Sequence, residues 1–236
     1  WTDGHESRIF FGYGAYLYAL DAENGKPINT FGDGGKIYLV DGIRRPGSDE
    51  YTALNTPVAI YKNTLIVVSR VAENASALLG DIRAFDAVSG KQLWTFRTIP
   101  KPGEFGYETW EPENYKNLGG ANNWMGMAID HERGILFAPT GSAAFDFYGG
   151  NRKGDNLFAN CLLALDIKTG KRLWHFQTVH HDIWDRDIPA PPNLFTINRD
   201  GKETDVVSVL SKQGFMFVFD RETGESIFPI EERPFP

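Results

Sequence analysis

One motif occurs four times along the chain and restricts the fold more than any other feature. Each copy is an apolar run followed by Asp, two variable residues, a small polar residue and Gly: "YLYALDAENGK", "DIRAFDAVSGK", "CLLALDIKTGK" and "FMFVFDRETGE". Asp accepts hydrogen bonds from the amides of a turn, and Gly adopts the left-handed conformation that closes it. The motif therefore predicts β-hairpins near residues 16–31, 81–97, 161–177 and 215–231.

The residues around each copy predict further strands. An apolar run precedes every hairpin ("RIFFGYG", "TLIVVSR", "GILFAPTG" and "DVVSVLS"), and another precedes three of these runs ("NTPVAIY", "WMGMAID" and "PPNLFTI"). Trp94 and Trp174 lie eight residues after the motif Asp, where a large side chain can pack between stacked sheets. Four short antiparallel strands per repeat are typical of a propeller blade. We therefore expect an all-β fold in which residues 1–236 form a single, partial β-propeller domain, an open arc of about four blades from a larger ring.

The composition disfavours several classes of partner. Lys and Arg number 24 against 31 Asp and Glu, a formal net charge of −7, whereas nucleic-acid binding needs a basic face. The sequence predicts no membrane span, because it holds no run of about 18 apolar residues. Cys161 is the only cysteine, which excludes an intrachain disulfide and a cysteine zinc cluster. The chain begins at Trp1 rather than at a methionine, and we expect it to be a mature or excised piece.

The segment "HHDIWDRDIPAPP", residues 180–192, has the composition of neither a core strand nor an ordinary solvated loop. It places two histidines, three acids and an arginine around Trp184, ahead of several prolines. Together with the downstream "SKQGFMFVFDRETGE", it resembles the quinoprotein dehydrogenases, eight-bladed propellers that bind pyrroloquinoline quinone (PQQ), and in particular their glucose dehydrogenase branch. "NNWMGMAID" and "PTGSAAFDFYGGNR" resemble the same branch. The resemblance covers essentially the whole chain, which by its blade count is about half of an eight-bladed ring.

The resemblance implies a set of site residues. Asp185 corresponds to the catalytic base, which also lies beside the metal, and Lys212 to the residue that hydrogen-bonds the reactive quinone carbonyls. Trp124 corresponds to the floor under the cofactor ring, with Asn123 beside it as a further cofactor contact. Glu73 corresponds to a carboxylate that binds Ca²⁺ close to the cofactor. A loop position that holds an asparagine ligand in methanol-oxidising relatives is Ser142 here, and serine is a weaker oxygen ligand.

These residue types suit the oxidation of an alcohol carbon. A carboxylate can take the hydroxyl proton while a hydride leaves, a contribution of roughly 10²–10⁴ in rate. A hard cation with oxygen ligands polarises the carbonyl that accepts the hydride, and a lysine stabilises the developing oxyanion. The implied activity is oxidation of a glucose-like sugar or an alcohol by hydride transfer to PQQ with the help of Ca²⁺. The resemblance also implies a periplasmic location, and it leaves the electron acceptor open between a quinone pool and a cytochrome.

Each of these residues also has a plainer interpretation when it is considered alone. Asp185 would be a turn acid paired with Arg186, Lys212 a solvated turn lysine, and Trp124 a core residue. Glu73 would be an exposed acid at a strand end. The alternative function is accordingly a non-catalytic propeller, a scaffold or assembly module, which would have no reason to combine Trp124, Asp185 and Lys212 at these spacings.

The remaining polar residues of the 180–192 segment are interpreted as structural. Adjacent histidines point to opposite sides of an extended chain, so His180 and His181 are expected to support the loop or face the substrate rather than share a metal. Asp182 and Asp187 are expected to be structural. Half a ring leaves a cofactor site open on one side, so we expect weak or no activity from the 236-residue chain alone.

Overall fold

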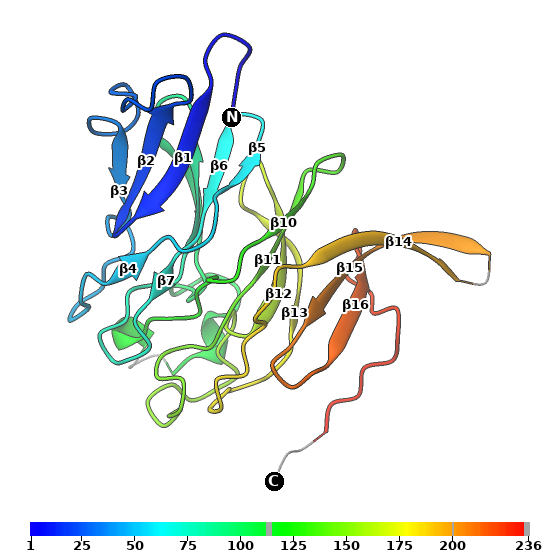
Figure 1. Cartoon of the computed structure of the whole chain (residues 1–236). Helices are drawn as coiled ribbons and strands as arrows, with labels where there is room; N and C mark the ends of the chain where they lie inside the picture. Colours follow the sequence, from blue (N-terminus) through cyan, green and yellow to red (C-terminus); the bar gives the residue numbers. More distant parts are fainter. Residues whose placement is uncertain (112–114, 200, 234–236) are drawn as a thin grey trace.

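Four antiparallel β-sheets follow one another along the chain (Figure 1). The computed structural model describes residues 1–111, 115–199 and 201–233. Within these ranges the only helices are two short 3₁₀ turns, η1 (Tyr107–Thr109) and η2 (Tyr115–Asn117). No helix in the described part of the chain is long and apolar enough to cross a bilayer. The all-β expectation is confirmed.

The sheets contain most of the strands that the repeat predicts. The first has the order β1-β2-β3, with bounds Arg8–Tyr13, Tyr16–Asp21 and Lys36–Tyr38. The second is β5-β6-β8-β9, with bounds Ala59–Tyr61, Thr64–Val67, Ile82–Asp86 and Gln92–Phe96. The third is β10-β11-β12-β13, with bounds Ala128–Asp130, Ile135–Pro139, Cys161–Asp166 and Arg172–Gln177. The fourth is β14-β15-β16, with bounds Asn193–Arg199, Lys202–Leu210 and Met216–Asp220, and a small ribbon pairs β4 (Thr52–Ala53) with β7 (Arg70–Val71).

The motif turns have the geometry that their sequence predicts. In the second sheet, the Asp86 carboxylate accepts hydrogen bonds from the amides of Val88 and Ser89, and the Gly90 amide donates to the Asp86 carbonyl. The motif glycine is left-handed in all four copies, with φ of 71° at Gly25, 75° at Gly90, 69° at Gly170 and 74° at Gly224. Each turn therefore sets the register of the hairpin that it closes.

The first and last hairpins are less regular than the middle two. After their turns the chain makes only single bridges, Leu20 with Pro27 and Phe219 with Ser226, instead of a full strand. Proline has no N–H to donate to a ladder, but the bonds on either side of Pro27 form: the Asp21 amide donates to the Lys26 carbonyl and the Ile28 amide to the Ala19 carbonyl. The edge of the first sheet is instead completed by β3, which pairs with β2 after a glycine-rich turn.

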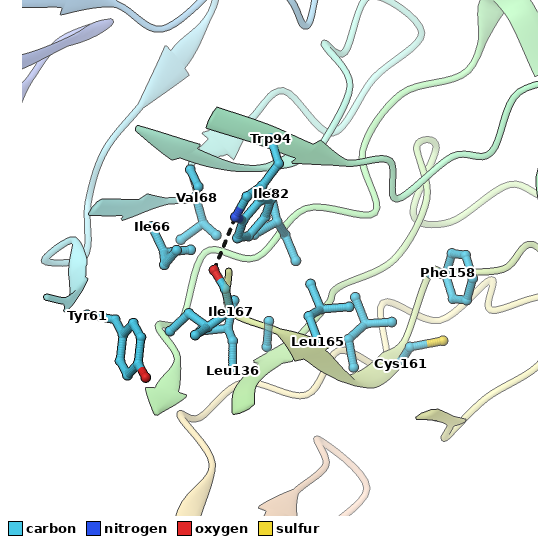
Figure 2. Close-up of a cluster of buried hydrophobic side chains, with 13 residues drawn as sticks. Tyr61, Ile66, Val68, Ile82, Trp94, Leu136, Phe158, Cys161, Leu165 and Ile167 are labelled. Carbon is cyan, nitrogen blue, oxygen red and sulfur yellow. Dashed lines mark hydrogen bonds between the residues drawn. The ribbon is translucent and has the colours of Figure 1, made fainter. Parts of the chain in front are cut away.

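The core lies between consecutive sheets. Side chains on a strand alternate between its two faces, so Leu163 and Leu165 of β12 face the second sheet, whereas Leu162 and Ala164 face the fourth. Figure 2 shows the layer between the second and third sheets, which includes Ile66, Val68, Ile82, Leu136 and Leu165. Strands β11 and β12 are buried on both faces for this reason.

Each repeat tryptophan joins its own sheet to the next one. The Trp94 indole N–H donates to the Ile167 carbonyl at 3.1 Å (Figure 2), and the Trp174 indole N–H donates to the Arg221 carbonyl at 3.0 Å. A Cβ on Gly170 would come within 2.5 Å of the Trp94 ring. Glycine is therefore required at position 170 for two reasons: the backbone is left-handed there, and the Trp94 ring leaves no room for a Cβ atom.

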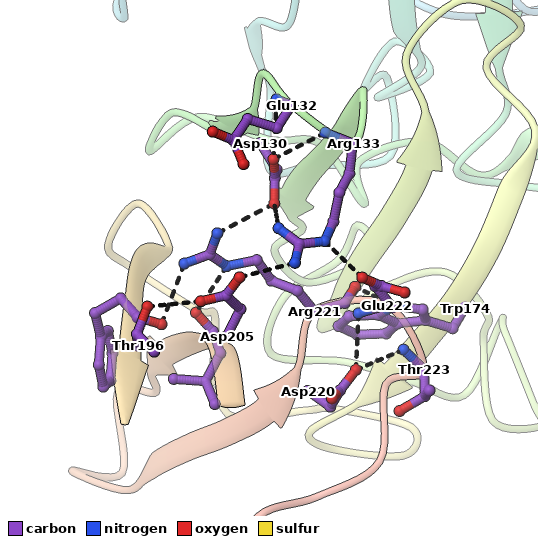
Figure 3. Close-up of polar contacts among 12 residues, drawn as sticks. Asp130, Glu132, Arg133, Trp174, Thr196, Asp205, Asp220, Arg221, Glu222 and Thr223 are labelled. Carbon is purple, nitrogen blue, oxygen red and sulfur yellow. Dashed lines mark hydrogen bonds and ion pairs between the residues drawn. The ribbon is translucent and has the colours of Figure 1, made fainter. Parts of the chain in front are cut away.

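An ion-pair network also joins the third and fourth sheets (Figure 3). Arg133, in the β10–β11 turn, pairs with Asp130 at 3.0 Å, with Asp205 at 2.8 Å and with Glu222 at 2.6 Å. Arg221 pairs with the same Asp130 at 3.1 Å. Because Asp130 is only 5 % exposed, two arginines from different sheets share one buried carboxylate. This fixes the fourth sheet, and with it the β15–β16 turn, relative to the third.

Candidate functional site

A pocket of about 340 Å³ lies where loops from several sheets meet, a volume in the range of small-molecule sites. Four of the five residues predicted for the site lie on its wall: Glu73 after β7, Trp124 before β10, Asp185 between β13 and β14, and Lys212 between β15 and β16. These residues are up to 139 positions apart in the sequence, from 73 to 212. The packed sheets bring them to one place.

Asp187 holds the wall of this pocket together. Its carboxylate accepts the Trp124 indole N–H at 3.0 Å and the Lys212 ammonium at 3.2 Å on one oxygen. Its other oxygen accepts the Ser142 amide at 2.7 Å and lies 3.1 Å from the Ser142 hydroxyl oxygen. The side chain is almost fully buried, with 5 % of the residue exposed. The structural role expected for Asp187 was incomplete, because this residue positions both the aromatic wall and the lysine.

Asp185 and Lys212 form an ion pair at 2.7 Å. Burial raises the pKa of Asp185, and the neighbouring Asp187 adds to this, although the hydrogen bond from Lys212 acts in the opposite direction. Burial lowers the pKa of Lys212, but the hydrogen bond to Asp185 and the charge of Asp187 outweigh it, so the net shift is upward. Lys212 is therefore a cation at neutral pH, and Asp185 is a better proton acceptor than an exposed aspartate.

The backbone at Asp185 is left-handed, with φ of 55°. This conformation is uncommon for a residue other than glycine and persists where the surroundings enforce it. Asp182 does so here: its carboxylate accepts the amides of Trp184 at 2.9 Å and Arg186 at 2.6 Å. Asp182 is itself 4 % exposed and is held by the Ser142 hydroxyl at 2.5 Å. The structural role expected for Asp182 agrees with these contacts.

The two histidines support the same loop. His181 hydrogen-bonds the Gly154 carbonyl through Nδ1 at 2.8 Å, and His180 hydrogen-bonds the Gln177 side chain at 2.8 Å. Neither histidine lines the pocket. Their contacts match the loop-supporting alternative.

Two of the predicted residues are placed differently from the rest. Asn123 is fully buried and does not line the pocket, because its side-chain amide both donates to and accepts from the Gly126 backbone. The neighbouring Asn122 lines the pocket instead. Glu73 lies at the pocket rim, with its side chain 66 % exposed and 3.5 Å from Arg70. The expectation that Asn123 contacts the cofactor therefore stays a prediction, and Asn122 is the asparagine of this pair that lines the pocket.

Asp146 is a site residue that the sequence did not reveal. It follows β11, lines the pocket and is 7 % exposed, yet it accepts no hydrogen bond from any residue that the structure describes. Burial raises its pKa to about 7, helped by the negative charges of Glu73, Asp185 and Asp187. The only signal was an acid within "SAAFDFYGG", a loop whose path the sequence does not specify.

The wall of the pocket is acidic. Its charged residues are four acids, Glu73, Asp146, Asp185 and Asp187, against the two cations Arg70 and Lys212. This excess suits a hard cation with oxygen ligands. Among the residues that the structure describes, however, no group of three or more His, Cys, Asp or Glu is arranged to hold a metal ion. Protein carboxylates alone therefore do not complete a metal site here, and Glu73 and Asp185 remain predicted ligands.

The unpaired burial of Asp146 leads to a stability prediction. Burial disfavours the charged form of Asp146 in the folded state and so lowers the free energy of unfolding wherever that form would otherwise be present. This loss is absent below pH 3.8, the ordinary pKa of Asp, and complete above about pH 7, the pKa in the folded protein. The difference between these two pKa values corresponds to a loss of at most about 4 kcal/mol in the free energy of unfolding. Asp146→Asn is therefore expected to raise the free energy of unfolding at pH 8 without added divalent cations, and to leave it nearly unchanged at pH 4. Urea titration at both pH values measures this, and an equal effect at both would contradict it.

Comparison with known proteins places the chain within one family. A family model described as the β-propeller domain of PQQ glucose/ethanol/alcohol dehydrogenases matches residues 1–236. The chain is 35 % identical over 226 residues to the glycerol dehydrogenase large subunit of Gluconobacter oxydans and likewise to the quinoprotein glucose dehydrogenase of Escherichia coli. Each alignment covers 93 % of this chain, but only 30 % and 28 % of those relatives. The chain thus spans about three tenths of their length.

A solved structure shows the same fold. The quinohemoprotein alcohol dehydrogenase of Comamonas testosteroni superposes with a TM-score of 0.81 at 27 % identity, over 96 % of this chain and 34 % of that protein. The four sheets are therefore consecutive parts of a β-propeller, as the repeat predicted.

Proposed function

The chain belongs to the PQQ glucose/ethanol/alcohol dehydrogenase β-propeller family, and we propose that the protein containing it is a quinoprotein oxidoreductase that oxidises a sugar or alcohol hydroxyl. The observation that carries this proposal is the convergence of Trp124, Asp185 and Lys212 on one pocket, joined through Asp187. A scaffold needs no such arrangement. The names of the relatives, which include glucose and glycerol dehydrogenases, support the substrate class.

The pocket residues have distinct roles in this proposal. Asp185 accepts the hydroxyl proton as the alcohol carbon is oxidised, and its raised pKa favours this. Lys212 remains protonated beside it and stabilises negative charge that develops in the pocket. Trp124, held at its indole nitrogen by Asp187, presents an apolar face on which a flat ring can lie. PQQ, when bound, supplies the two-electron acceptor for the hydride.

We further propose Ca²⁺ as the cation, with Glu73 and Asp185 among its ligands. The acidic wall supports this, because a divalent cation would offset the excess of carboxylates over Arg70 and Lys212. Such a cation would act as a Lewis acid toward the hydride acceptor. The periplasmic location remains a proposal from family resemblance.

Equilibrium binding of PQQ tests the proposal in the protein that carries the complete propeller. Trp124→Ala is expected to weaken binding about tenfold or more, because it removes the aromatic face, and about 1.4 kcal/mol corresponds to tenfold. Trp184→Ala is the matched control, since Trp184 is 63 % exposed and does not line the pocket. Absorbance of PQQ in equilibrium dialysis, with and without Ca²⁺, gives the affinities. Absence of saturable binding to the unmodified protein would support the scaffold alternative instead.

A further inference from the structure

Asp146 differs from the other acids that line the pocket. Asp185 and Asp187 bind Lys212, and Glu73 pairs with Arg70. Asp146 has no such partner among the described residues, although it is more than nine-tenths buried. Buried polar groups are normally satisfied, so one that is left open on a pocket wall indicates a ligand that satisfies it.

Arg152 is the cation whose charge acts on Asp146, but it donates no hydrogen bond to that carboxyl group. The Arg152 guanidinium donates to the Asn156 side chain at 2.8 Å and to the Phe145 carbonyl at 2.9 Å, and it also donates to the Asp182 carbonyl. These contacts hold the loop that precedes Asp185. Arg152 thus supports the backbone of the site and leaves the Asp146 carboxylate facing the pocket.

The chemistry of the pocket indicates what Asp146 would bind. A carboxylate accepts hydrogen bonds, and a protonated carboxyl also donates one, so the partner of Asp146 is a cation or a group such as a hydroxyl that can donate and accept. The Ca²⁺ proposed for this pocket is assigned to Glu73 and Asp185, and among the described residues no third His, Cys, Asp or Glu is arranged with such a pair to hold a metal ion. Hydroxyl groups of a substrate are partners of this kind. The amide side chain of Asn55 on the same wall suits a further hydroxyl group, whereas the Asn122 side-chain nitrogen already donates to the Ser69 carbonyl at 3.0 Å.

We infer that Asp146 is a specificity-determining residue that accepts hydrogen bonds from substrate hydroxyls adjacent to the one that is oxidised. The inference rests on the proposed function and narrows it: the substrate is a polyol or sugar rather than a monohydric alcohol. An alcohol without neighbouring hydroxyl groups would cover Asp146 when it binds, and it would offer this carboxyl group no hydrogen bond. Sites built to hydrogen-bond a hydroxyl discriminate strongly against analogues that lack it.

Three substrates with the same carbon chain test this in the holoenzyme: propan-1-ol, propane-1,2-diol and glycerol. The unmodified enzyme is expected to prefer glycerol in kcat/KM. Asp146→Leu is expected to lower kcat/KM for glycerol by roughly 10- to 100-fold, mainly through KM, and to leave propan-1-ol unchanged or improved. Asp146→Asn, which retains an acceptor oxygen, is expected to be intermediate.

Two further measurements separate recognition of substrate from other effects. Glycerol binding to the Asp185→Asn holoenzyme, in which the base is removed, is expected to weaken when Asp146→Leu is added, while the affinities for PQQ and Ca²⁺ stay the same. Asp81→Asn is the matched control, because Asp81 is 4 % exposed but lies outside the pocket, where its carboxylate accepts the Thr98 amide at 3.2 Å. It is expected to keep the preference for glycerol.

The outcomes are distinguishable. An equal loss for all three alcohols together with weaker Ca²⁺ or PQQ binding would overturn the inference and assign Asp146 to the cation or cofactor. An unchanged preference in both Asp146 variants of an active enzyme would also overturn it, while the proposed function would stand. An unmodified protein that neither binds PQQ nor oxidises any of the three alcohols would instead show that the proposed function fails.

Discussion

Asp185→Asn is expected to lower kcat by about 10²–10⁴ while PQQ still binds. The amide has nearly the same shape as the carboxylate but cannot accept the hydroxyl proton. The fold of the loop should be unaffected, because Asp182 rather than Asp185 holds its amides. Lys212 also keeps a partner in the variant, since it lies 3.2 Å from Asp187. Steady-state dye reduction in the holoenzyme measures kcat, and equilibrium dialysis measures PQQ affinity.

Two comparisons make the result specific to the base. Asp155→Asn removes an exposed acid that does not line the pocket, and it is expected to leave kcat unchanged. Asp185→Glu keeps a carboxylate but displaces it, and a displacement of about 1 Å can cost 10²-fold in rate. Normal turnover by Asp185→Asn would remove Asp185 from the proposed chemistry and leave it as the ion-pair partner of Lys212.

The fold could be predicted from the sequence because its information is local and repeated. An Asp and a Gly four residues apart fix each turn, and Asp86 and Gly90 show both contacts directly. The first hairpin departs from the pattern after its turn, where only the single bridge of Leu20 with Pro27 forms. A fifth turn of the same kind, from Asp130 to Gly134, was missed, although "DHERG" has the same Asp-to-Gly spacing.

The site was predictable only in part, because its contacts join segments that are distant in the sequence. Family resemblance identified Trp124, Asp185 and Lys212, which the structure brings together. The roles of Asp187 and Asp146 depend on which side chains surround them, and no spacing encodes this. Asp187 lies two residues from Asp185, but the left-handed backbone at Asp185 breaks the alternation that would otherwise relate the two side chains.

Trp174→Ala is expected to lower the free energy of unfolding by about 3–5 kcal/mol, the usual cost of removing a buried large aromatic side chain. Trp174 is 8 % exposed and packs against Phe137 of its own sheet and Phe219 of the next, with ring centroids 5.8 Å away in each case. Its indole N–H also bonds the Arg221 carbonyl. Denaturant titration of the protein with the complete propeller measures the loss, and Trp184→Ala, at an exposed site, is the control.

The contact of Trp174 with the fourth sheet is expected to affect the pocket as well as the stability of the fold. The fourth sheet carries the β15–β16 turn, so loss of its contact with the third sheet should loosen Lys212 as well as the core. PQQ affinity is therefore expected to fall in Trp174→Ala even where most of the protein is folded. Gly224→Ala tests the contact from the other side, because its Cβ would lie 2.6 Å from the Trp174 ring and φ there is 74°. If both variants unfolded like the unmodified protein, the repeat tryptophan would not be the element that holds one blade to the next.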